Sequence, residues 1–350
     1  MDRREFLIKS ATGIAALAAP AWLKATPSRP AAKLARLADD RYELISEDPD
    51  RLRILQITDT HFGTPKPANL LTDAQTKKLI RALVDQQNPA FVFHTGDFIN
   101  NDTEGVDHSA IDFMNDLGTP WSLVFGNHDH SKGQKNGISL DDYYKRLQNH
   151  AVGFHTYKES GVEKRDYCFR IDIRPATGPI AYSLFAFNCG SPITQMVVTE
   201  SQLNWLRSQL EADKRANHDH PILVMQHIPT IEYKTLFEEK AAIGRQGEKV
   251  CFESDMGAVF ETYRASARVK AVFCGHDHVN DYFGDHKGIK LAYGRVSGWS
   301  GYGDWQRGGR VIDLDLKNRS SKTRVVLPQG AVEKQEWNKT LTEGQIGRPN

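Results

Sequence analysis

The chain has 350 residues and a formal net charge of +1, with 39% hydrophobic and 25% charged residues. This composition is typical of a soluble globular protein, and the length allows one large domain with a substantial buried core. Because the net charge is close to zero and Lys and Arg are scattered, the sequence predicts no general attraction to nucleic acid or to an anionic membrane surface.

The N-terminal 25 residues have a pattern of their own. Arg3 and Arg4 precede a small, weakly apolar stretch from Ala11 to Leu23, which contains alanine-rich cleavage candidates. This pattern resembles an export signal of the twin-arginine type, with the twin-arginine export machinery as partner and a periplasmic or secreted product. The stretch is shorter than the roughly 20 residues of a membrane span, so no stable membrane anchor is expected. The alternative is a cytosolic amphipathic helix, which cleavage of the exported chain would exclude.

Residues 26–50 are rich in Pro, Ala and charge, and they are interpreted as a linker. The predicted domain covers residues 51–327, and a polar tail on the surface follows over 328–350. The chain has four cysteines without CxxC spacing, which indicates buried free thiols rather than a zinc finger. They are Cys168, Cys189, Cys251 and Cys274.

The first half of the predicted domain alternates strand-like and helix-like runs. Apolar strands are predicted over 52–57, 91–93 and 121–125, and helices over 72–87, 109–117 and 139–148. Thr72 can cap the first of these helices, because Gln75 follows three residues later as in a capping box.

The second half continues the pattern with a helix over 199–212 and apolar strands over 222–225 and 269–273. A β-rich finish is predicted over 290–293, 310–316 and 323–327. Alternation of apolar strands with amphipathic helices predicts an α/β fold whose strands are buried on both faces.

Five of the apolar strands run directly into Asp, Asn or His. The short segments that follow them are Thr58-Asp59-Thr60-His61, His94-Thr95-Gly96-Asp97, Gly126-Asn127-His128-Asp129, Gln226-His227 and Gly275-His276-Asp277-His278. Open α/β sheets bind ligands beyond the carboxyl ends of their strands, so these side chains are expected at one rim. The glycines in these segments permit tight turns there.

Seven of these side chains are candidate metal ligands: Asp59, His61, Asp97, Asn127, His227, His276 and His278. Oxygen and imidazole ligands without thiolates favour Zn, Mn, Fe or Co. Seven ligands exceed the need of one catalytic ion with an open position. They suit two ions about 3.5–4 Å apart that share a carboxylate.

The five segments, in this order between Leu52 and Leu316, resemble the signature of the calcineurin-like metallophosphoesterases. Residues 52–61, 227–229, 269–284 and 298–313 further resemble a purple-acid-phosphatase-like branch known from plants and fungi. The resemblance implies a four-layer αββα sandwich. It also implies a cofactor of two divalent or mixed-valence metal ions (Mn, Fe or Zn) whose identity the sequence leaves open.

The resemblance implies a role for each residue of the signature. Asp59, His61 and His278 would bind the first metal, and Asn127, His227 and His276 the second, with Asp97 as the bridge. His128 would stabilise the phosphoryl charge and protonate the leaving oxygen. Asp129 would support catalysis by orienting His128 or a neighbouring turn.

The implied function is hydrolysis of a phosphate ester by a hydroxide held between the two metals, with phosphomonoesters as the first expectation. A phosphodiesterase acting on nucleotide or phospholipid-headgroup diesters is the alternative. A non-catalytic metal-containing binding protein is a third possibility, which a missing ligand would have favoured. No basic stripe supports a nuclease, and the sequence does not indicate an oligomeric state.

One position departs from the purple acid phosphatases. There, a tyrosine three residues after the bridging Asp ligates iron and gives the colour, whereas this chain has Asn100. The sequence therefore predicts no tyrosinate–iron absorption band.

Three further residues are candidate substrate contacts, each with an alternative. His130 contacts substrate or is an exposed loop histidine. Trp305 and Arg307, in a loop rich in glycine and aromatics, line a substrate pocket or pack over the sheet. Residues 238–252 form a lid over the site or a surface excursion, and the sequence does not separate the two.

Overall fold

The computed structural model describes residues 32–63, 69–100, 109–130, 139–148, 166–189, 197–303 and 305–341. The predicted export signal over residues 1–25 lies outside these ranges and stays a prediction. Within the described part of the chain, no helix is long and apolar enough to cross a membrane.

The smaller of the two main sheets has five strands in the order β14-β13-β3-β4-β5. Their bounds are β3 (Arg51–Ile57), β4 (Phe91–Thr95), β5 (Trp121–Val124), β13 (Gly309–Asp315) and β14 (Ser320–Val326). Strands β3, β4 and β5 are parallel, so their carboxyl ends meet at one edge. Strand β13 runs antiparallel to β3, with Arg310 opposite Gln56.

The larger sheet has eight strands in the order β1-β2-β6-β7-β8-β10-β12-β11. They are β1 (Ala32–Arg36), β2 (Arg41–Ser46), β6 (Cys168–Pro175), β7 (Tyr182–Phe187), β8 (Ile222–Met225), β10 (Val269–Cys274), β11 (Phe283–His286) and β12 (Ile289–Tyr293). Strands β7, β8, β10 and β12 are parallel. Two short strands, β9 (Arg245–Gln246) and β15 (Lys339–Thr340), pair separately.

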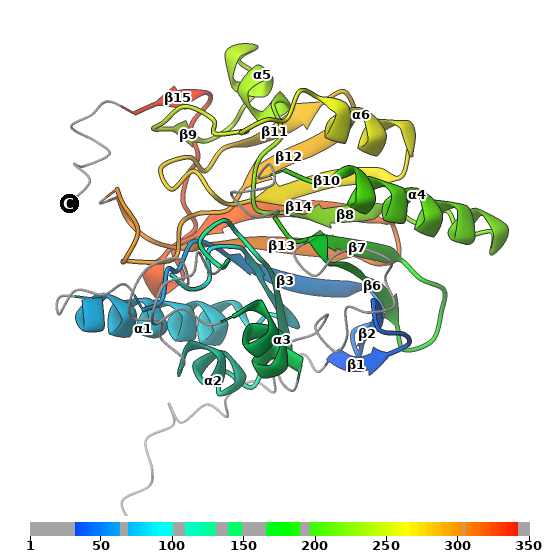
Figure 1. The fold of residues 1–350 in the computed structure, drawn as a ribbon, viewed down its shortest axis with the longest axis horizontal. Coiled ribbons are helices and arrows are strands. Elements are labelled where there is room, and N and C mark those ends of the chain that lie inside the picture. The colour runs from blue at the N-terminus through cyan, green and yellow to red at the C-terminus, as the bar shows by residue number, and fades with distance from the viewer. Residues whose placement is uncertain are drawn as a thin grey trace, which may run out of the picture.

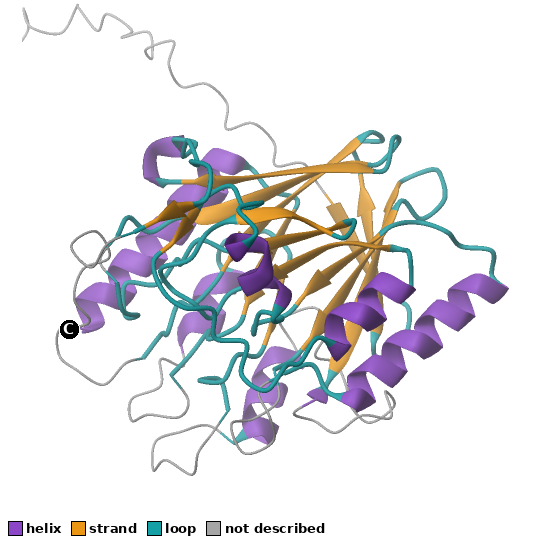
Figure 2. Cartoon of the chain, turned by 90° about the horizontal axis from the view of Figure 1, so that it is seen from above, coloured by secondary structure: helices purple, strands orange, loops and turns teal. Residues whose placement is uncertain are grey.

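Helices cover the outer faces of the two sheets. Figure 1 shows α1 (Asn69–Gln87), α2 (Ser109–Asn115) and α3 (Leu140–Gln148) on one side of the strands, and α4 (Glu200–Arg215), α5 (Glu232–Glu238) and α6 (Ala258–Ala265) on the other. Seen from above, the strands fan out with the twist that is normal for sheets (Figure 2). The predicted four-layer αββα sandwich is confirmed.

The core follows the two faces of the larger sheet. Along β7 and β8, Leu184 and Leu223 belong to the cluster that lies between the sheets. Their chain neighbours Phe185 and Val224 belong to the cluster under α4–α6. Successive side chains of a strand point to opposite faces, so uninterrupted apolar runs are what a strand buried on both sides requires.

The predicted linker over residues 26–50 is wrong for residues 32–46, which form β1 and β2. In β2 the side chains of Tyr42 and Leu44 are buried, and this alternation is the signal of a half-buried strand. Its neighbour Glu43 pairs with Arg174 of β6 at 2.7 Å.

The predicted polar tail is only partly correct, because residues 328–341 are polar and lie near the surface but belong to the fold. Glu333 pairs with Arg245 and Arg295, and β15 pairs with β9. The predicted cap at Thr72 is also wrong, since α1 begins at Asn69 and the Thr72 hydroxyl instead lies 2.9 Å from that of Ser300.

A network of buried charges connects strands β2, β6 and β7 of the larger sheet with helix α4. Asp172 is fully buried and accepts hydrogen bonds from Arg41 at 2.8 Å, from Arg170 at 2.7 Å and from the Ser183 hydroxyl at 2.6 Å. Arg170 is also fully buried and reaches Asp213 at 2.9 Å. Because each charge has its partners, burial does not leave any of them uncompensated.

Replacing Asp172 with Ala leaves the Arg170 guanidinium without its main partner in the core. We expect the free energy of unfolding to fall by about 3–5 kcal/mol, measured by urea denaturation. Glu43→Ala, which breaks the more exposed pair with Arg174, is the matched control and is expected to cost about 0–1 kcal/mol. Equal losses of unfolding free energy in the two variants would show that burial of Asp172 does not increase its contribution to stability.

Candidate metal centre

The loops that follow β3, β4, β8 and β10 are bound to one another through their backbones. The amide of Asp59 donates to the carbonyl of Gly96 at 3.1 Å, and that of His61 donates to Asp97 at 3.0 Å. Within the larger sheet, the Gly275 amide donates to the carbonyl of His227 at 3.1 Å; between the sheets, the Ser297 amide, after β12, donates to the carbonyl of Thr58, after β3, at 3.0 Å. The carboxyl ends of strands from both sheets therefore meet at a single rim.

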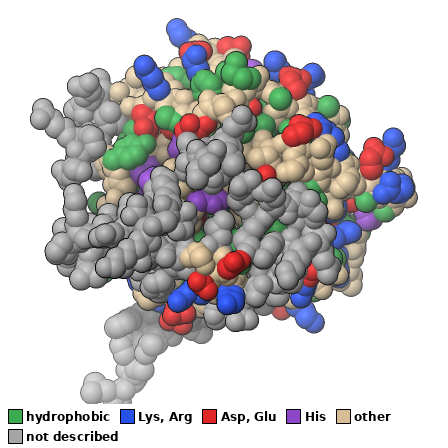
Figure 3. All heavy atoms as spheres, viewed as in Figure 1, with side chains coloured by type: hydrophobic (Ala, Val, Ile, Leu, Met, Phe, Trp, Pro, Cys, Tyr) green, Lys and Arg blue, Asp and Glu red, His purple; other side chains and the backbone are tan. Residues whose placement is uncertain are grey.

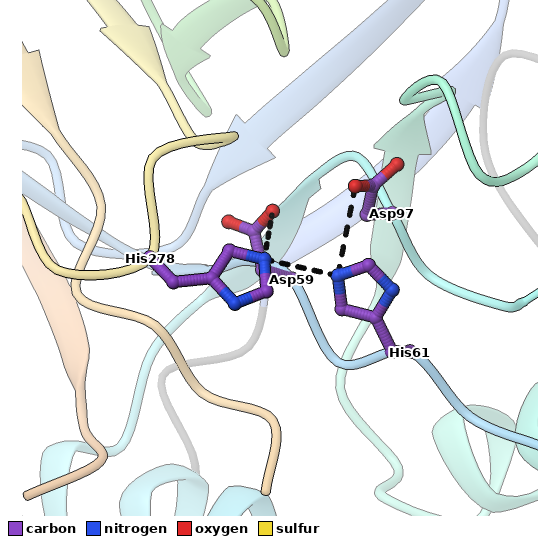
Figure 4. Close-up of side chains that lie close together, drawn as sticks. All are labelled: Asp59, His61, Asp97 and His278. Carbon is purple, nitrogen blue, oxygen red and sulfur yellow. Dashed lines mark hydrogen bonds and ion pairs between the residues drawn. The ribbon is translucent and has the colours of Figure 1, made fainter. Parts of the chain in front are cut away.

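Four predicted ligands form the first candidate group. Asp59, His61, Asp97 and His278 each offer an atom within 4.8 Å of the others, and all four are buried. Figure 4 shows the two imidazoles facing each other, with His61 Nε2 3.0 Å from His278 Nε2. His278 Nε2 lies 3.5 Å from Asp59 Oδ1, and His61 Nε2 lies 3.6 Å from Asp97 Oδ2.

A second group shares Asp97 with the first. It consists of Asp97, His227 and His276, again within 4.8 Å, with His227 Nε2 3.3 Å from Asp97 Oδ2. The backbone of Gly126 lies against both partners, because a methyl group at this position would overlap the Asp97 carboxylate and His227 Nε2. Only glycine therefore allows the segment that carries Asn127 to approach this closely.

Burial keeps the imidazoles of the first group neutral. It lowers the pKa of His61 to about 4, and it holds the pKa of His278 well below the usual range. A neutral imidazole offers a lone pair, which is the form that binds a metal.

The carboxylate of Asp97, which the two groups share, is kept in its charged form. Burial alone would raise the pKa of Asp97, but His227, His128 and His61 hold it well below its usual value. Burial favours a neutral His227, yet Asp97 and Asp59 raise its pKa to about 9. The geometry thus calls for positive charge beside Asp97, and a metal ion would take the place of the His227 proton.

Four ligand candidates have left-handed backbone conformations. Their φ angles are +53° for Asp59, +47° for His61, +55° for Asp97 and +76° for His276. Such conformations cost free energy in residues with a side chain, and they concentrate at functional sites. The loops are held in this state by the hydrogen bonds described above.

The site fits a pair of metal ions. Two buried atoms of predicted ligands, Asn127 Oδ1 and His227 Nε2, have no hydrogen-bond partner within the described chain. In the first group, two imidazole nitrogens with lowered pKa values face each other at 3.0 Å. A cation between such atoms would satisfy them, because they are ligands of the kind that Zn, Mn and Fe accept.

The two predicted catalytic residues lie beside this centre. The His128 amide donates to Asp97 Oδ1 at 2.9 Å, and its ring lies 5.0 Å from that of His61. Asp129 is buried and accepts from the amides of Ile99 at 3.0 Å and Gly126 at 2.8 Å. Burial and Asp97 raise the pKa of Asp129 to about 7. Of the two predicted roles, these hydrogen bonds favour orientation of the neighbouring turns.

The three predicted substrate contacts are all buried. His130 is not an exposed loop histidine, because its side chain is buried and its Nε2 lies 2.7 Å from the carbonyl of Cys189. Trp305 donates through Nε1 to the His278 carbonyl at 2.9 Å and lies under the Arg295 guanidinium. Arg307 is buried and donates to the carbonyls of Gly301 and Tyr302. All three side chains are therefore buried and bonded to backbone carbonyls of the protein, which favours packing over contact with substrate.

His94 lies beside the candidate ligands as a structural histidine, with Nε2 2.9 Å from the Thr60 hydroxyl. The four cysteines are free, as predicted; the predicted burial is confirmed for Cys168, Cys189 and Cys274 and is wrong for Cys251, which is exposed. The segment 238–252 is bound to the loop after β10, because the Gly247 amide donates to the Val279 carbonyl at 2.9 Å.

Several residues around the ligands were not predicted as site residues from the sequence. Tyr302 stacks on His278 with ring centroids 4.1 Å apart, and Glu253 Oε1 lies 3.5 Å from His276 Nε2. Gln56 joins the sheets by donating to the Cys274 carbonyl at 3.0 Å. These residues lie outside the signature segments, and only tertiary contacts reveal them. Histidine side chains reach the surface in the middle of the face shown in Figure 3.

The family comparison gives a match between residues 52–280 and the model of the calcineurin-like phosphoesterases. Two relatives from Arabidopsis thaliana bear the names "probable inactive purple acid phosphatase 28" and "14". The first is 29% identical over 77% of this chain and 76% of its own length, and the second is 26% identical over 79% and 78%. A solved dimetal phosphatase from Danio rerio aligns over 79% of this chain and 99% of its own, with 13% identity and a TM-score of 0.48.

Asp97 is the one residue common to both candidate groups, so its loss should affect both. We expect Asp97→Ala to bind neither metal ion, measured by elemental analysis after reconstitution and dialysis. Asp166→Ala removes another buried carboxylate, one that accepts from Thr199 at 3.0 Å, and it should keep the metal content of the wild type. Retention of both ions by Asp97→Ala would refute its bridging position.

Proposed function

The chain belongs to the calcineurin-like phosphoesterase family, and we propose that it is an active hydrolase of phosphate esters that uses two metal ions. The observation that carries the proposal is the position of Asp97, which lies in both candidate groups. Asp59, His61 and His278 would hold one ion with Asp97, and Asn127, His227 and His276 the other. When bound, the pair would supply Lewis-acid stabilisation of phosphate oxygens and an activated water near neutral pH.

Residues of the chain would bind the ester and donate one proton to the departing oxygen. His128 is a partly exposed member of the signature, and its backbone is fixed by the 2.9 Å bond to Asp97. An imidazole at this place can donate a hydrogen bond to the phosphoryl group and a proton to the departing oxygen. Asp129 would hold the two turns that set the position of His128.

A non-catalytic binding protein is the alternative from another class, and the word "inactive" in the relatives' names favours it. The complete set of ligand candidates together with His128 favours an enzyme. The preference for monoesters is supported by the relatives' similarity to purple acid phosphatases, and a phosphodiesterase remains the second candidate. We also propose that the chain is exported, which is supported by the Arg3-Arg4 pattern.

The first test compares p-nitrophenyl phosphate with bis-p-nitrophenyl phosphate, using the metal-reconstituted full chain. We expect kcat/KM for the monoester to be at least about tenfold higher, equivalent to roughly 1.4 kcal/mol in the barrier. The reverse ratio would indicate a phosphodiesterase. No turnover of either ester with two ions bound would favour the binding protein.

The role of His128 is tested by His128→Ala. We expect the variant to keep its metal content and to lose about 10²–10⁴-fold in kcat, because proton donation and charge stabilisation are lost. His218→Ala, on a half-exposed histidine that follows α4, should leave both quantities unchanged. Loss of metal in His128→Ala would show instead that His128 is a ligand.

A further inference from the structure

The ligand histidines differ in what holds their second ring nitrogen. His61 Nδ1 lies 2.8 Å from the side-chain oxygen of Asn100, and His227 Nδ1 lies 2.7 Å from the backbone carbonyl of Thr95. Both partners are neutral oxygens. Each leaves Nε2 as the nitrogen that faces Asp97.

His276 has a charged partner instead. Its Nε2 lies 3.5 Å from Glu253 Oε1, with the imidazole 13% exposed and the carboxylate 33% exposed. If Nε2 is directed to Glu253, Nδ1 is the nitrogen left for Asp97 and His227. Among the described residues outside the two candidate groups, Glu253 is the carboxylate paired with a ligand histidine.

The segment around Glu253 is fixed on both sides. The Cys251 amide donates to Asp277 Oδ2 at 3.2 Å, and Asp277 in turn accepts from the Tyr293 hydroxyl at 2.5 Å. On the other side, Asp255 accepts from the Ile231 amide at 2.8 Å. Glu253 itself has a φ angle of +51°, a conformation that costs free energy. A strained residue held in place by neighbours is pre-organised for contact with His276.

We propose that Glu253 is a positioning residue that fixes the ring of His276 and selectively strengthens metal binding by Asn127, His227 and His276. This inference rests on the two-metal site proposed above. A carboxylate that accepts from a ligand imidazole sets the ring orientation and makes the other nitrogen more basic, and loss of such a partner typically weakens metal affinity about 10–100-fold. Neutral partners, such as Asn100 at His61, give a smaller effect, so the two metal sites become unequal.

The test is a calorimetric titration of the metal-free full chain with Zn²⁺, comparing wild type, Glu253→Gln and Glu248→Gln. Glu248 is the matched control because it lies in the same segment and its change likewise replaces a carboxyl group with an amide. Its carboxylate accepts from the Val279 amide at 3.0 Å and the Tyr302 hydroxyl at 2.8 Å, rather than from a ligand histidine.

We expect the wild type to bind two ions. In Glu253→Gln, one of the two affinities should fall about 10–100-fold while the other stays within about twofold. Glu248→Gln should resemble the wild type. Selective weakening can be assigned to the second group by repeating the titration in His227→Ala, where the affected step should disappear.

Three results would overturn the inference. Unchanged affinities in Glu253→Gln would show that the carboxylate does not act on His276. Equal weakening in Glu248→Gln would point to a general effect of losing a carboxyl group from this segment. Complete loss of one ion in Glu253→Gln would make Glu253 a direct ligand. A wild-type chain that binds fewer than two ions would refute the proposed function itself. Failure of the two-metal proposal is therefore distinguishable from failure of the inference about Glu253.

Discussion

The buried carboxylate of Asp97 is the constraint on which the rest of the site depends. An ionised carboxylate removed from water costs several kcal/mol unless charges or hydrogen bonds compensate it. Here the compensation comes from both halves of the molecule, because His61 belongs to the loop after β3, the His128 amide to the loop after β5, and His227 to the loop after β8. A fold that buries Asp97 must therefore bring the two sheets together at this rim.

The compensation also explains the unusual backbone of the loops. Left-handed conformations at Asp59, His61, Asp97 and His276 are unfavourable when isolated, yet hydrogen bonds between the loops hold them. Asp129 contributes by accepting amides from the turns after β4 and β5. Side chains that would bind metal are thus aimed before any ion arrives, so little reorganisation is needed on binding.

The fold does not decide between a phosphatase and a protein that binds phosphate esters without cleaving them. A scaffold of this kind can retain its sheets and lose its chemistry, so function must be argued from the site. In this chain the ligand candidates of both groups and the flanking His128 are all in place. The pairing of Glu253 with His276 adds an asymmetry between the two groups, since the partners of His61 and His227 are neutral.

The sequence by itself determined the strands that lead into the five signature segments, the α/β alternation and the set of candidate ligands, because an apolar run followed by Asp, Asn or His is a local pattern. It failed where the deciding contact is distant in the chain. Residues 32–46 were interpreted as a linker, although β2 pairs both with β1 and with β6, which lies more than 120 residues further along the chain. His130 was predicted to be a substrate contact or an exposed loop histidine, although the Cys189 carbonyl and the ring of Phe125 bury it. Tertiary structure alone placed Tyr302, Glu253 and Arg307, because burial and ion pairing depend on neighbours that sequence spacing does not reveal.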